Sequence, residues 1–427
     1  MKRFQFMQKA CAVMFLVAIF AFSAFNIYVE GPSLINGIKM LALPKESSEL
    51  KRYVQGAENV VNTNIAERIK FIEFYAYLQK LMGKKESGGF DIVQSDQGEL
   101  IYANFYAAVP DRMSEYARRM WRMSIQADKH DAKVMFVNPT DMYVRGYSNY
   151  YAGLPAYDQN DSQDALLYYL QSYGVEWLDT RSALYVSGLP LEKFQYKTDH
   201  HWTTEAAFEA FRAIVERLNE RFDANLDPSG FYRNIDNYNA QTYPDSFLGT
   251  LGQRSGLIFS ELDDFTLIWP KFDTEYIWEA YREDRGITEK RGDFVDALLL
   301  TYALRTDDPY ETGLYAAYMG GSNAWVKLTN TLNPNGPKLF LVHDSYSLPL
   351  ASFLSQLFSE IHMVWPLAPG QPIDIEEYLQ DNEFDYIIVA LYSGNLNGSA
   401  FAFYTEPLEE EVNALEEARA RAAQEGE

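Results

Sequence analysis

The sequence predicts an α/β protein with a mainly parallel central sheet, helices on both faces, one long insertion and an N-terminal transmembrane helix. Three observations lead to this expectation. Short apolar runs such as "KVMFV" (133–137) are rich in β-forming residues and stop at turn residues, as strands buried on both faces do. These runs alternate with helical segments, which is the pattern of βα units. A long segment without charge precedes them all.

The N-terminal segment has the charge pattern of an exported protein. "MKRFQFMQK" is cationic, and residues Ala10–Val29 follow without a charge, about enough for a helix to span a bilayer. Positive residues on the leading side keep that end in the cytoplasm and send the rest outward. We therefore expect residues 1–29 to be a single-pass membrane anchor with the body extracytoplasmic. A signal peptide cleaved near Ala21-Phe22-Ser23, giving a secreted protein, is the alternative.

The composition excludes several classes of protein and of functional site. Hydrophobic residues make up 47% of the chain and aromatic residues 15%, so it can bury a substantial core. A net charge of −23 argues against a nucleic-acid partner, because phosphate binding needs clustered Lys and Arg. The only cysteine, Cys11, lies in the uncharged segment. The exported body therefore has no disulfide, no thiol nucleophile and no cysteine-containing zinc site.

The rest of the chain divides into a stalk, one large domain and a tail. Residues 30–60 mix Gly, Pro and Ser and are expected to be a stalk or linker. The domain spans 61–405, and within it the strand–helix alternation breaks down at about 223–335, which indicates a long insertion over one edge of the sheet. Residues 406–427 are charged and Ala-rich, as in a solvated helix. The expected helices and strands, in order, are helix 64–86, strands 90–94 and 99–103, helix 111–131, strand 133–137, helix 162–174, strand 175–180, helix 203–222, strand 337–344, helix 345–360, strand 361–366, helix 374–383 and strand 384–392.

Two places carry residues that could do chemistry. In "QYKTDHHWTTEAAF" (195–208), Asp199 and two histidines stand just before a predicted helix that Thr203 or Thr204 caps. In "LFLVHDSYSLPL" (339–350), Ser345 directly follows a buried strand and opens a helix. Free backbone N–H groups and the helix dipole at that position favour an alkoxide and an oxyanion.

These residues allow two kinds of site. A serine becomes a nucleophile when a base lies within hydrogen-bond reach and an acid orients that base. Asp199 and His201 supply both if they meet Ser345 at the carboxyl edge of the sheet. The alternative is a metal site with Asp199, His200, His201 and His343 as ligands, although the sequence has no His-x-x-x-His spacing of the helical kind.

"DHHW" at 199–202 resembles the naming motif of the DHHW protein family. That family is similar to the SGNH-hydrolase-like domains of the AlgX/AlgJ group of alginate O-acetylation proteins. Further blocks resemble the family in the same order between about 61 and 400. They are "NIAERIKFIEFYAYLQKLMGKKE", "DSFLGTLGQRSGL", "DDFTLIWP", "YMGGSN", "LFLVHDSYS" and "FDYIIVALYSGN".

The resemblance implies an SGNH-type three-layer α/β/α fold and a Ser-His-Asp triad, with Ser345 as nucleophile, His201 as base and Asp199 as orienting acid. His343-Asp344-Ser345 stands where other SGNH enzymes have Gly-Asp-Ser, so the resemblance does not carry a hydrolase-like oxyanion geometry over to this position. Candidate oxyanion donors are the Ser345 amide, Gly321 and Asn323. Further oxyanion or substrate candidates are Arg254, His200, His343 and Trp202. No metal and no cofactor is expected.

The implied chemistry is acyl transfer outside the cytoplasm. Ser345 would take an acetyl group and pass it to a hydroxyl of a cell-wall or exopolysaccharide, as an O-acetyltransferase, or to water, as an O-acetylesterase. A separate membrane protein could deliver the acyl group, as in systems that resemble alginate acetylation. The alternatives are a non-catalytic glycan-binding or scaffolding protein of the same fold and a metal-dependent surface hydrolase.

Overall fold

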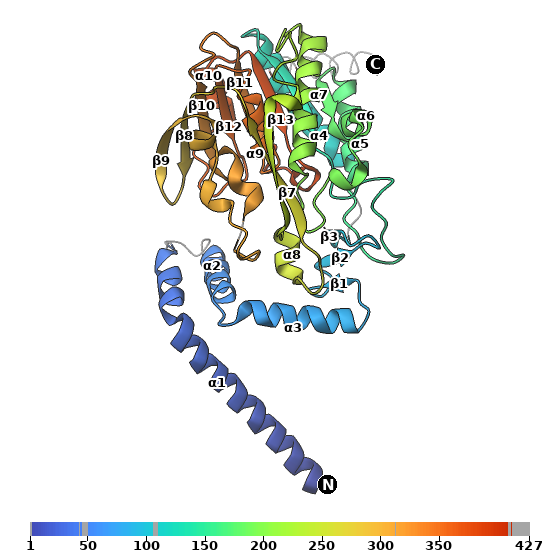
Figure 1. The fold of residues 1–427 in the computed structure, drawn as a ribbon, viewed down its shortest axis with the longest axis vertical. Coiled ribbons are helices and arrows are strands. Elements are labelled where there is room, and N and C mark those ends of the chain that lie inside the picture. The colour runs from blue at the N-terminus through green and yellow to red at the C-terminus, as the bar shows by residue number, and fades with distance from the viewer. Residues whose placement is uncertain are drawn as a thin grey trace, which may run out of the picture. The chain divides into compact units, whose positions relative to one another are not determined.

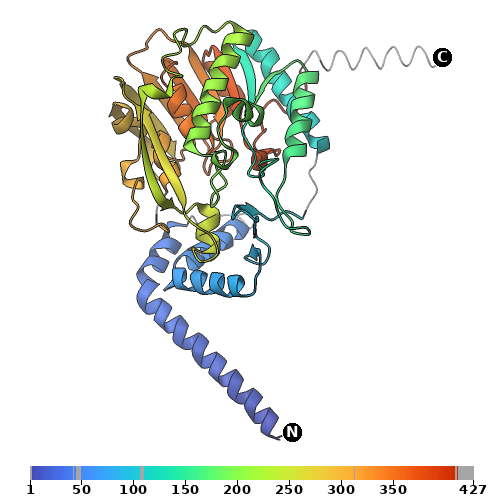
Figure 2. The ribbon, with the colours of Figure 1, turned by 45° about the vertical axis from the view of Figure 1, so that its right-hand side comes forward.

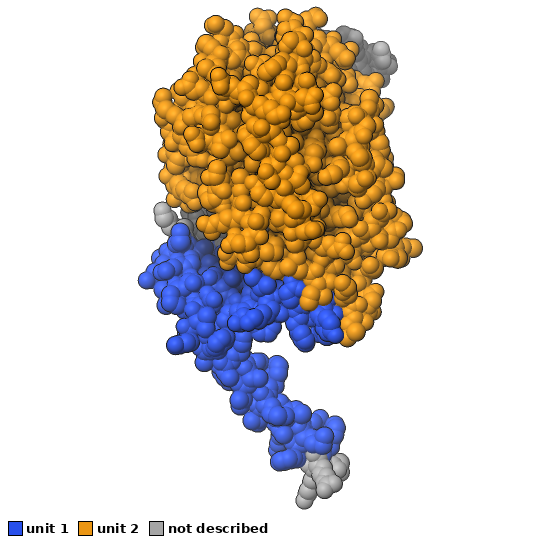
Figure 3. All heavy atoms as spheres, in the orientation of Figure 1, with its two compact units in different colours: residues 1–78 blue, residues 79–427 orange. Residues whose placement is uncertain are grey.

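The computed structural model describes residues 2–41, 43–44, 50–105, 110–311, 313–408 and 411. The chain divides into two compact units, Met1–Leu78 and Gln79–Glu427, which Figure 3 shows in blue and orange.

The first unit is helical. It holds α1 (Lys2–Met40), α2 (Leu50–Thr63) and most of α3 (Arg68–Leu81). The stretch Phe4–Met40 of α1 is long enough and contains a segment apolar enough to cross a membrane, with its side chains exposed, and it also fits a signal sequence. The helix runs beyond the expected segment 1–29, so the first part of the expected stalk is helical, and α2 occupies the part from Leu50 onward.

The second unit is built on an eight-stranded sheet with the strand order β5-β4-β13-β11-β12-β10-β8-β9. The first five strands in this order are parallel to one another and the last three are antiparallel to their neighbours. The sheet is therefore mostly parallel, as expected. The strands in sheet order are β5 (Glu176–Asp179), β4 (Lys133–Asn138), β13 (Tyr386–Ala390), β11 (Lys338–His343), β12 (Glu360–Val364), β10 (Trp325–Asn330), β8 (Tyr276–Arg282) and β9 (Gly286–Gly292).

Helices cover both faces of this sheet (Figures 1 and 2). Along β11, Leu339 and Leu341 belong to one buried apolar cluster, whereas Phe340 and Val342 belong to the other. This alternation is the period of two that a strand buried on both faces requires. The layer on the first face contains α6 (Thr180–Ser187), α7 (Thr204–Phe222) and α9 (Ser347–Leu354), and the opposite layer contains α4 (Met113–Asp128), α5 (Asn160–Ser172) and α10 (Ile375–Asp381).

The expected insertion at 223–335 has structure of its own. It forms a separate two-stranded sheet, and its strands β8, β9 and β10 extend one edge of the central sheet. A small three-stranded sheet, β1-β2-β3, precedes α4. The remaining elements are β1 (Glu86–Ser87), β2 (Ile92–Gln94), β3 (Leu100–Tyr102), β6 (Tyr238–Phe247), α8 (Thr250–Ser255), β7 (Asp263–Pro270), the short helical turns at Pro110–Arg112, Leu191–Lys193, Ile235–Asn237, Phe294–Leu298, Thr301–Ala303, Leu314–Gly320 and Ser393–Asn395. Most of the expected tail helix 406–427 lies outside the described residues.

The topology brings distant loops to one edge. Because β4, β13 and β11 are neighbouring parallel strands, the segments that follow Asn138, Ala390 and His343 all leave the sheet at its carboxyl end. Ser345 lies in the third of these segments.

Candidate active site

Ser345 lies in the turn between β11 and α9. The helix begins at Ser347, two residues later than Ser345, and its first turn is prepared by bonds from Ser347 N to Asp344 O (3.1 Å) and from Leu348 N to Ser345 O (3.3 Å). Among the described residues, no acceptor is found for the backbone N–H of Ser345. Ser345 therefore presents both a hydroxyl and an uncommitted amide at the carboxyl edge of the sheet.

The Asp199–Trp202 segment is a tight loop directly before α7. Gln195 and Trp202 pair across its base in an antiparallel bridge. Thr203 caps α7 as predicted, since its side chain accepts a hydrogen bond from Ala206 N at 3.1 Å. The loop is thus held at both ends, and the Asp199 and His201 side chains between them have defined positions.

Three side chains from these two loops form one hydrogen-bonded chain. His201 Nδ1 lies 2.5 Å from Asp199 Oδ1, and His201 Nε2 lies 2.7 Å from Ser345 Oγ. The second contact joins residues 144 positions apart in the sequence. A carboxylate on Nδ1 fixes the imidazole tautomer that leaves Nε2 as the acceptor for the serine proton. The order acid, base, hydroxyl is that of a nucleophilic triad.

Asp199 is held in its ionised form. It is buried, and burial alone raises the pKa of a carboxyl group. The neighbouring His201 and His200 outweigh this effect, together with hydrogen bonds from His201 and from Thr250 N (2.6 Å), so that the pKa of Asp199 lies well below its ordinary value. Gly249 makes the approach of Thr250 possible, because a Cβ on Gly249 would lie 2.6 Å from Asp199 Cα and Oδ2.

Aromatic residues fix the imidazole and join the two loops. The ring of Tyr315 stacks on His201 with 3.9 Å between centroids and 17° between planes. Trp202 Nε1 donates to Tyr315 Oη (3.1 Å) and to Tyr346 O (3.0 Å). Trp202, a candidate for substrate contact, is fully buried, so the structure places it behind the site as a link between loops.

His200 lies beside the triad and outside its hydrogen-bonded chain. Its ring lies 3.9 Å from that of His201, and the rings of Tyr102 and Tyr392 lie 6.3 and 6.0 Å away. Its Nδ1 is 3.6 Å from Asp199 Oδ1 and makes no hydrogen bond to the described residues. Burial, with the nearby His201, lowers the pKa of His200 to about 4, so the ring is neutral near pH 7.

Asp344 fastens the nucleophile loop to the loop after β13. Its fully buried carboxylate accepts hydrogen bonds from Tyr346 N (3.0 Å), Tyr392 N (2.8 Å) and Asn395 Nδ2 (2.9 Å). His343, the other residue expected beside the serine, is also fully buried, and its Nδ1 lies 2.8 Å from Asp344 O. Burial lowers the pKa of His343 to about 4.

The other predicted oxyanion and substrate residues lie outside the triad. Gly321 N donates to Tyr318 O at 2.9 Å, and the buried Asn323 amide donates to Gly321 O at 2.9 Å. Both donors are thus engaged within their own turn. Arg254 pairs with Asp91 and lies over the ring of Tyr102, 5.7 Å from its centroid. Because Tyr102 is a neighbour of His200, Arg254 belongs to the surroundings of the site.

Several residues that complete the site were not predicted as site residues. Gly249 and Thr250 support Asp199, Tyr315 stacks on His201, and Tyr392 and Asn395 fix Asp344. The signal available for four of them was the resemblance to the family, because Gly249 and Thr250 lie in "DSFLGTLGQRSGL" and Tyr392 and Asn395 in "FDYIIVALYSGN".

The metal alternative finds three of its four ligands together. Potential ligand atoms of Asp199, His200 and His201 lie within 4.8 Å of one another, and His343 is not part of this group. Both ring nitrogens of His201 are already in short contacts with Asp199 and Ser345. A metal ion on His201 would have to replace one of these two partners, so the geometry suits the triad better.

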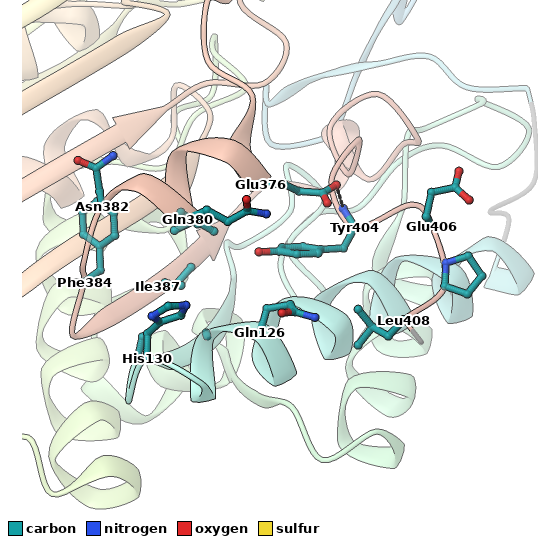
Figure 4. Close-up of a pocket in the computed structure, with 14 residues that line it drawn as sticks. Gln126, His130, Glu376, Gln380, Asn382, Phe384, Ile387, Tyr404, Glu406 and Leu408 are labelled. Atoms are coloured by element: carbon teal, nitrogen blue, oxygen red, sulfur yellow. Dashed lines mark hydrogen bonds between the residues drawn. The ribbon is translucent and has the colours of Figure 1, made fainter. Parts of the chain in front are cut away.

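Two hollows of the second unit are not lined by Ser345. A cavity of about 270 Å³ lies between α4, α10 and residues 404–408, and Figure 4 shows Tyr404 between Gln126 and Glu376 there. Because Ile387, at the start of β13, lines it, this cavity is at the amino end of the parallel strands, opposite to the triad. A second hollow of about 210 Å³ lies beside the ends of β4 and β5.

Comparisons with known proteins support the fold. The structure of Bacillus cereus PatB1 with a sulfonyl adduct has a TM-score of 0.59 and 15% identity, over 73% of this chain and 97% of that chain. A DHHW family protein from Eubacterium siraeum has a TM-score of 0.53 and 19% identity, over 74% of this chain and 93% of that chain. This chain shares their fold. The SGNH-like α/β fold and the likeness to a DHHW family protein, both expected from the sequence, are confirmed at the level of the fold.

Other comparisons add less. The O-acetyltransferase domain of Pseudomonas putida AlgJ also matches, with a TM-score of 0.41 and 13% identity, over 74% of this chain and 98% of that chain. No protein-family model and no curated protein matches the sequence.

Proposed function

We propose that the protein transfers acyl groups by a Ser345-His201-Asp199 triad, acting as an O-acetyltransferase or O-acetylesterase on a polysaccharide outside the cytoplasm. The observation that carries this proposal is the continuous chain Asp199–His201–Ser345, in which a 2.5 Å contact within one loop is followed by a 2.7 Å contact to a segment far away in the sequence. A structural serine at a helix start has no need of a histidine that is itself held by a buried carboxylate.

The first half of the reaction loads the serine. Ser345 Oγ attacks the carbonyl carbon of an acyl donor while His201 Nε2 takes the hydroxyl proton. Asp199, ionised and close to Nδ1, stabilises the imidazolium that forms. The bond from the carbonyl carbon to the leaving oxygen then breaks, and that oxygen takes the proton from His201. The enzyme is left as an acyl-serine with a neutral histidine.

The second half repeats these steps with another nucleophile. A sugar hydroxyl, or water in the esterase direction, gives its proton to His201 and attacks the acyl-serine, and Ser345 leaves with the proton that His201 returns. In both halves the carbonyl oxygen carries negative charge in the tetrahedral intermediate. The free N–H of Ser345 is the oxyanion donor that this structure supplies, in place of the engaged Gly321 and Asn323.

The substrate class follows from the surroundings and from the family resemblance. An N-terminal helix that can span a membrane, or serve as a signal sequence for export, is consistent with an enzyme that modifies a polymer of the cell envelope. The DHHW motif and the shared fold support acetyl as the acyl group and a polysaccharide as the acceptor. The acyl donor is then a small acyl ester or a membrane protein that passes the group to Ser345.

An ester assay on the full-length protein in neutral detergent tests the proposal. Hydrolysis of a chromogenic acetyl ester should fall by about a thousandfold or more in Ser345→Ala. Ser347→Ala is the matched control, because the Ser347 hydroxyl is also buried, has no hydrogen-bond partner among the described residues and lies two positions away. An activity that survives Ser345→Ala removes this residue from the mechanism.

Chemical labelling gives a second readout that needs no substrate. A sulfonyl fluoride should form a sulfur–oxygen bond with Ser345 Oγ and release fluoride, and mass spectrometry of the digested protein locates the adduct. His201→Ala should slow this labelling strongly, since it removes the proton acceptor. If neither protein hydrolyses esters and Ser345 stays unlabelled while glycan binding is retained, the scaffolding function replaces the enzymatic one.

A further inference from the structure

A cation-rich hollow of the second unit includes Lys197 of the "QYKTDHHW" segment in its lining. It has a volume of about 360 Å³ and is lined by Lys80, Lys84, Lys85 and Lys197, together with two acids, Asp96 and Glu261. The chain as a whole has a net charge of −23. With four lysines and two acids in its lining, this hollow therefore has an excess of positive charge in a protein whose net charge is negative.

Most of this positive charge is available to a ligand. Lys84 pairs with Glu86 at 2.9 Å, and Lys85 donates to Gln94 Oε1 at 3.2 Å. Within the part of the chain that the structure describes, Lys80, Lys85 and Lys197 form no ion pair. Of the two acids, Asp96 already accepts a hydrogen bond from Asn149 at 2.7 Å. Lys80 and Lys85 thus have no carboxylate of their own among the described residues at this concave surface, and Lys197 interacts electrostatically with Glu99, a carboxyl group whose pKa burial raises to about 7.

Short pieces of chain connect this hollow to the triad. Lys197 precedes Asp199 by two residues, which limits the distance between their Cα atoms to about 7 Å. Its backbone N–H donates to Asp263 Oδ1 at 2.9 Å, and Thr198 N donates to Asp263 Oδ2 at 2.8 Å, so the hollow and the acid share one anchored segment. On the other side, β3 leads from the hollow to Tyr102 beside His200.

The type of cation indicates the type of anion. Arginine is the residue that matches a planar carboxylate through two parallel hydrogen bonds, and no arginine lines this hollow. Lysines are compact point charges, and several of them can approach one phosphate from different directions, because its charge is spread over tetrahedral oxygens. Gln97 adds an amide group to the lining, as recognition of a sugar or polyol would need, whereas the Gln94 amide and the Ser260 hydroxyl already bond to Phe259 O and Gly256 O. A flat basic patch would suit a lipid surface, whereas this hollow is concave.

We propose that this lysine pocket binds a phosphate group of the acceptor, and that the acceptor is a phosphate-bearing glycan or polyol polymer of the cell envelope. The statement that the bound polymer is the acyl acceptor rests on the proposed function, whereas binding of a phosphate group at the pocket does not depend on catalysis. The pocket would hold one unit of the polymer while a neighbouring unit presents its hydroxyl to the acyl-serine.

Binding measured on the full-length Ser345→Ala protein in neutral detergent tests the pocket apart from the chemistry. The probes are a fluorescent oligomer of glycerol phosphate, an oligogalacturonate with the same number of charges, and uncharged maltohexaose. We expect the phosphate oligomer to bind most tightly, with an affinity that falls as salt is raised. The substitution of Lys80, Lys85 and Lys197 by Gln should weaken its binding by about tenfold or more.

Control proteins and alternative ligands decide the outcome. Lys129→Gln removes one exposed lysine outside the pocket, so it should leave the affinity unchanged, and thermal melting checks that the pocket variants are folded. Equal or tighter binding of the oligogalacturonate overturns the phosphate assignment. If the protein does not bind the oligomer but is retained on vesicles containing phosphatidylglycerol, and the lysine substitutions abolish this retention, the pocket contacts lipid instead. Binding of the phosphate oligomer by a protein without esterase activity leaves the pocket standing and refutes only the proposed reaction.

Discussion

The substitution Gly249→Ala adds one methyl group directly against Asp199. The backbone at Gly249 has φ −69° and ψ 176°, which any residue adopts, so alanine brings no backbone strain of its own. Its Cβ would come closest to Asp199 Cβ and would lie 2.6 Å from both Cα and Oδ2 of Asp199, whereas ordinary contacts begin near 3.4 Å. Asp199 and residue 249 must therefore move apart by about 1 Å. This displacement also lengthens the 2.6 Å hydrogen bond from Thr250 N to Asp199 Oδ2.

The effect should fall on the chemical step. A misplacement of about 1 Å in a catalytic group costs on the order of a hundredfold in rate. We expect kcat for acetyl-ester hydrolysis to drop by roughly tenfold to a hundredfold in Gly249→Ala while KM changes little. The clash should also cost about 1–3 kcal/mol in the free energy of unfolding, measured by urea denaturation. Gly398→Ala is the matched control, because a Cβ at Gly398 meets nothing within 4 Å and needs no unusual φ.

A double-mutant cycle separates an effect through Asp199 from a general loss of structure. If the methyl group acts by displacing Asp199, Gly249→Ala should change kcat little in an Asp199→Asn protein, whose acid is already lost. Equal losses of kcat in both backgrounds would show that Gly249 acts by another route. A Gly249→Ala protein with full activity and normal stability would refute the reasoning outright, since the contact leaves no room for the methyl group without movement.

Three other changes give independent tests. Burial raises the pKa of Glu99 to about 7 from 4.5, so its stabilising contribution is complete below pH 4.5 and is lost as the pH rises to 7. Because burial also raises the pKa of Asp141 and Asp263, the test is a difference: over this window the free energy of unfolding in urea should fall by about 3 kcal/mol more in the wild type than in Glu99→Gln. Asp344→Asn leaves one acceptor oxygen for three hydrogen-bond donors, so it should lower the free energy of unfolding by about 1–3 kcal/mol and reduce kcat. Asp374→Asn is the control, because Asp374 caps a helix at an exposed position and its substitution should have a smaller effect. Dialysis against EDTA should leave ester hydrolysis unchanged, because His201 already uses both ring nitrogens; a loss restored by zinc would return the metal site to first place.

The fold was predictable where local pattern and tertiary environment agree. "KVMFV" and "KLFLV" are continuous apolar runs, and both are strands with one cluster of core residues on each face. The insertion was predicted only as a break in the pattern. That three of its strands join the central sheet depends on pairing with β12, and such long-range pairing leaves no periodic signal in the segment itself.

The site residues that carry a reactive or ionisable side chain in a distinctive sequence context could be predicted. The residues that act through their size or their packing could not. Asp199, His201 and Ser345 stand out as chemical groups next to predicted strand and helix ends, and the structure brings them together. Gly249 matters because it lacks a side chain, and Tyr315 is one of 31 tyrosines in the chain. Nothing local distinguishes it from the tyrosines of the core, since its position against His201 is set by the packing of another segment.

The "DHHW" segment joins its own loop to the loop that carries Ser345. Asp199 and His201 stand on either side of His200, whose backbone oxygen accepts a hydrogen bond from Tyr346 Oη. Trp202 donates to Tyr346 O, so the residue after Ser345 is held at its hydroxyl and its carbonyl by the loop that carries the base. His201 and Ser345 are therefore positioned by the same two contacts that join their loops. The His200 imidazole takes no part in these contacts, and the rings of Tyr102 and Tyr392 are among its neighbours.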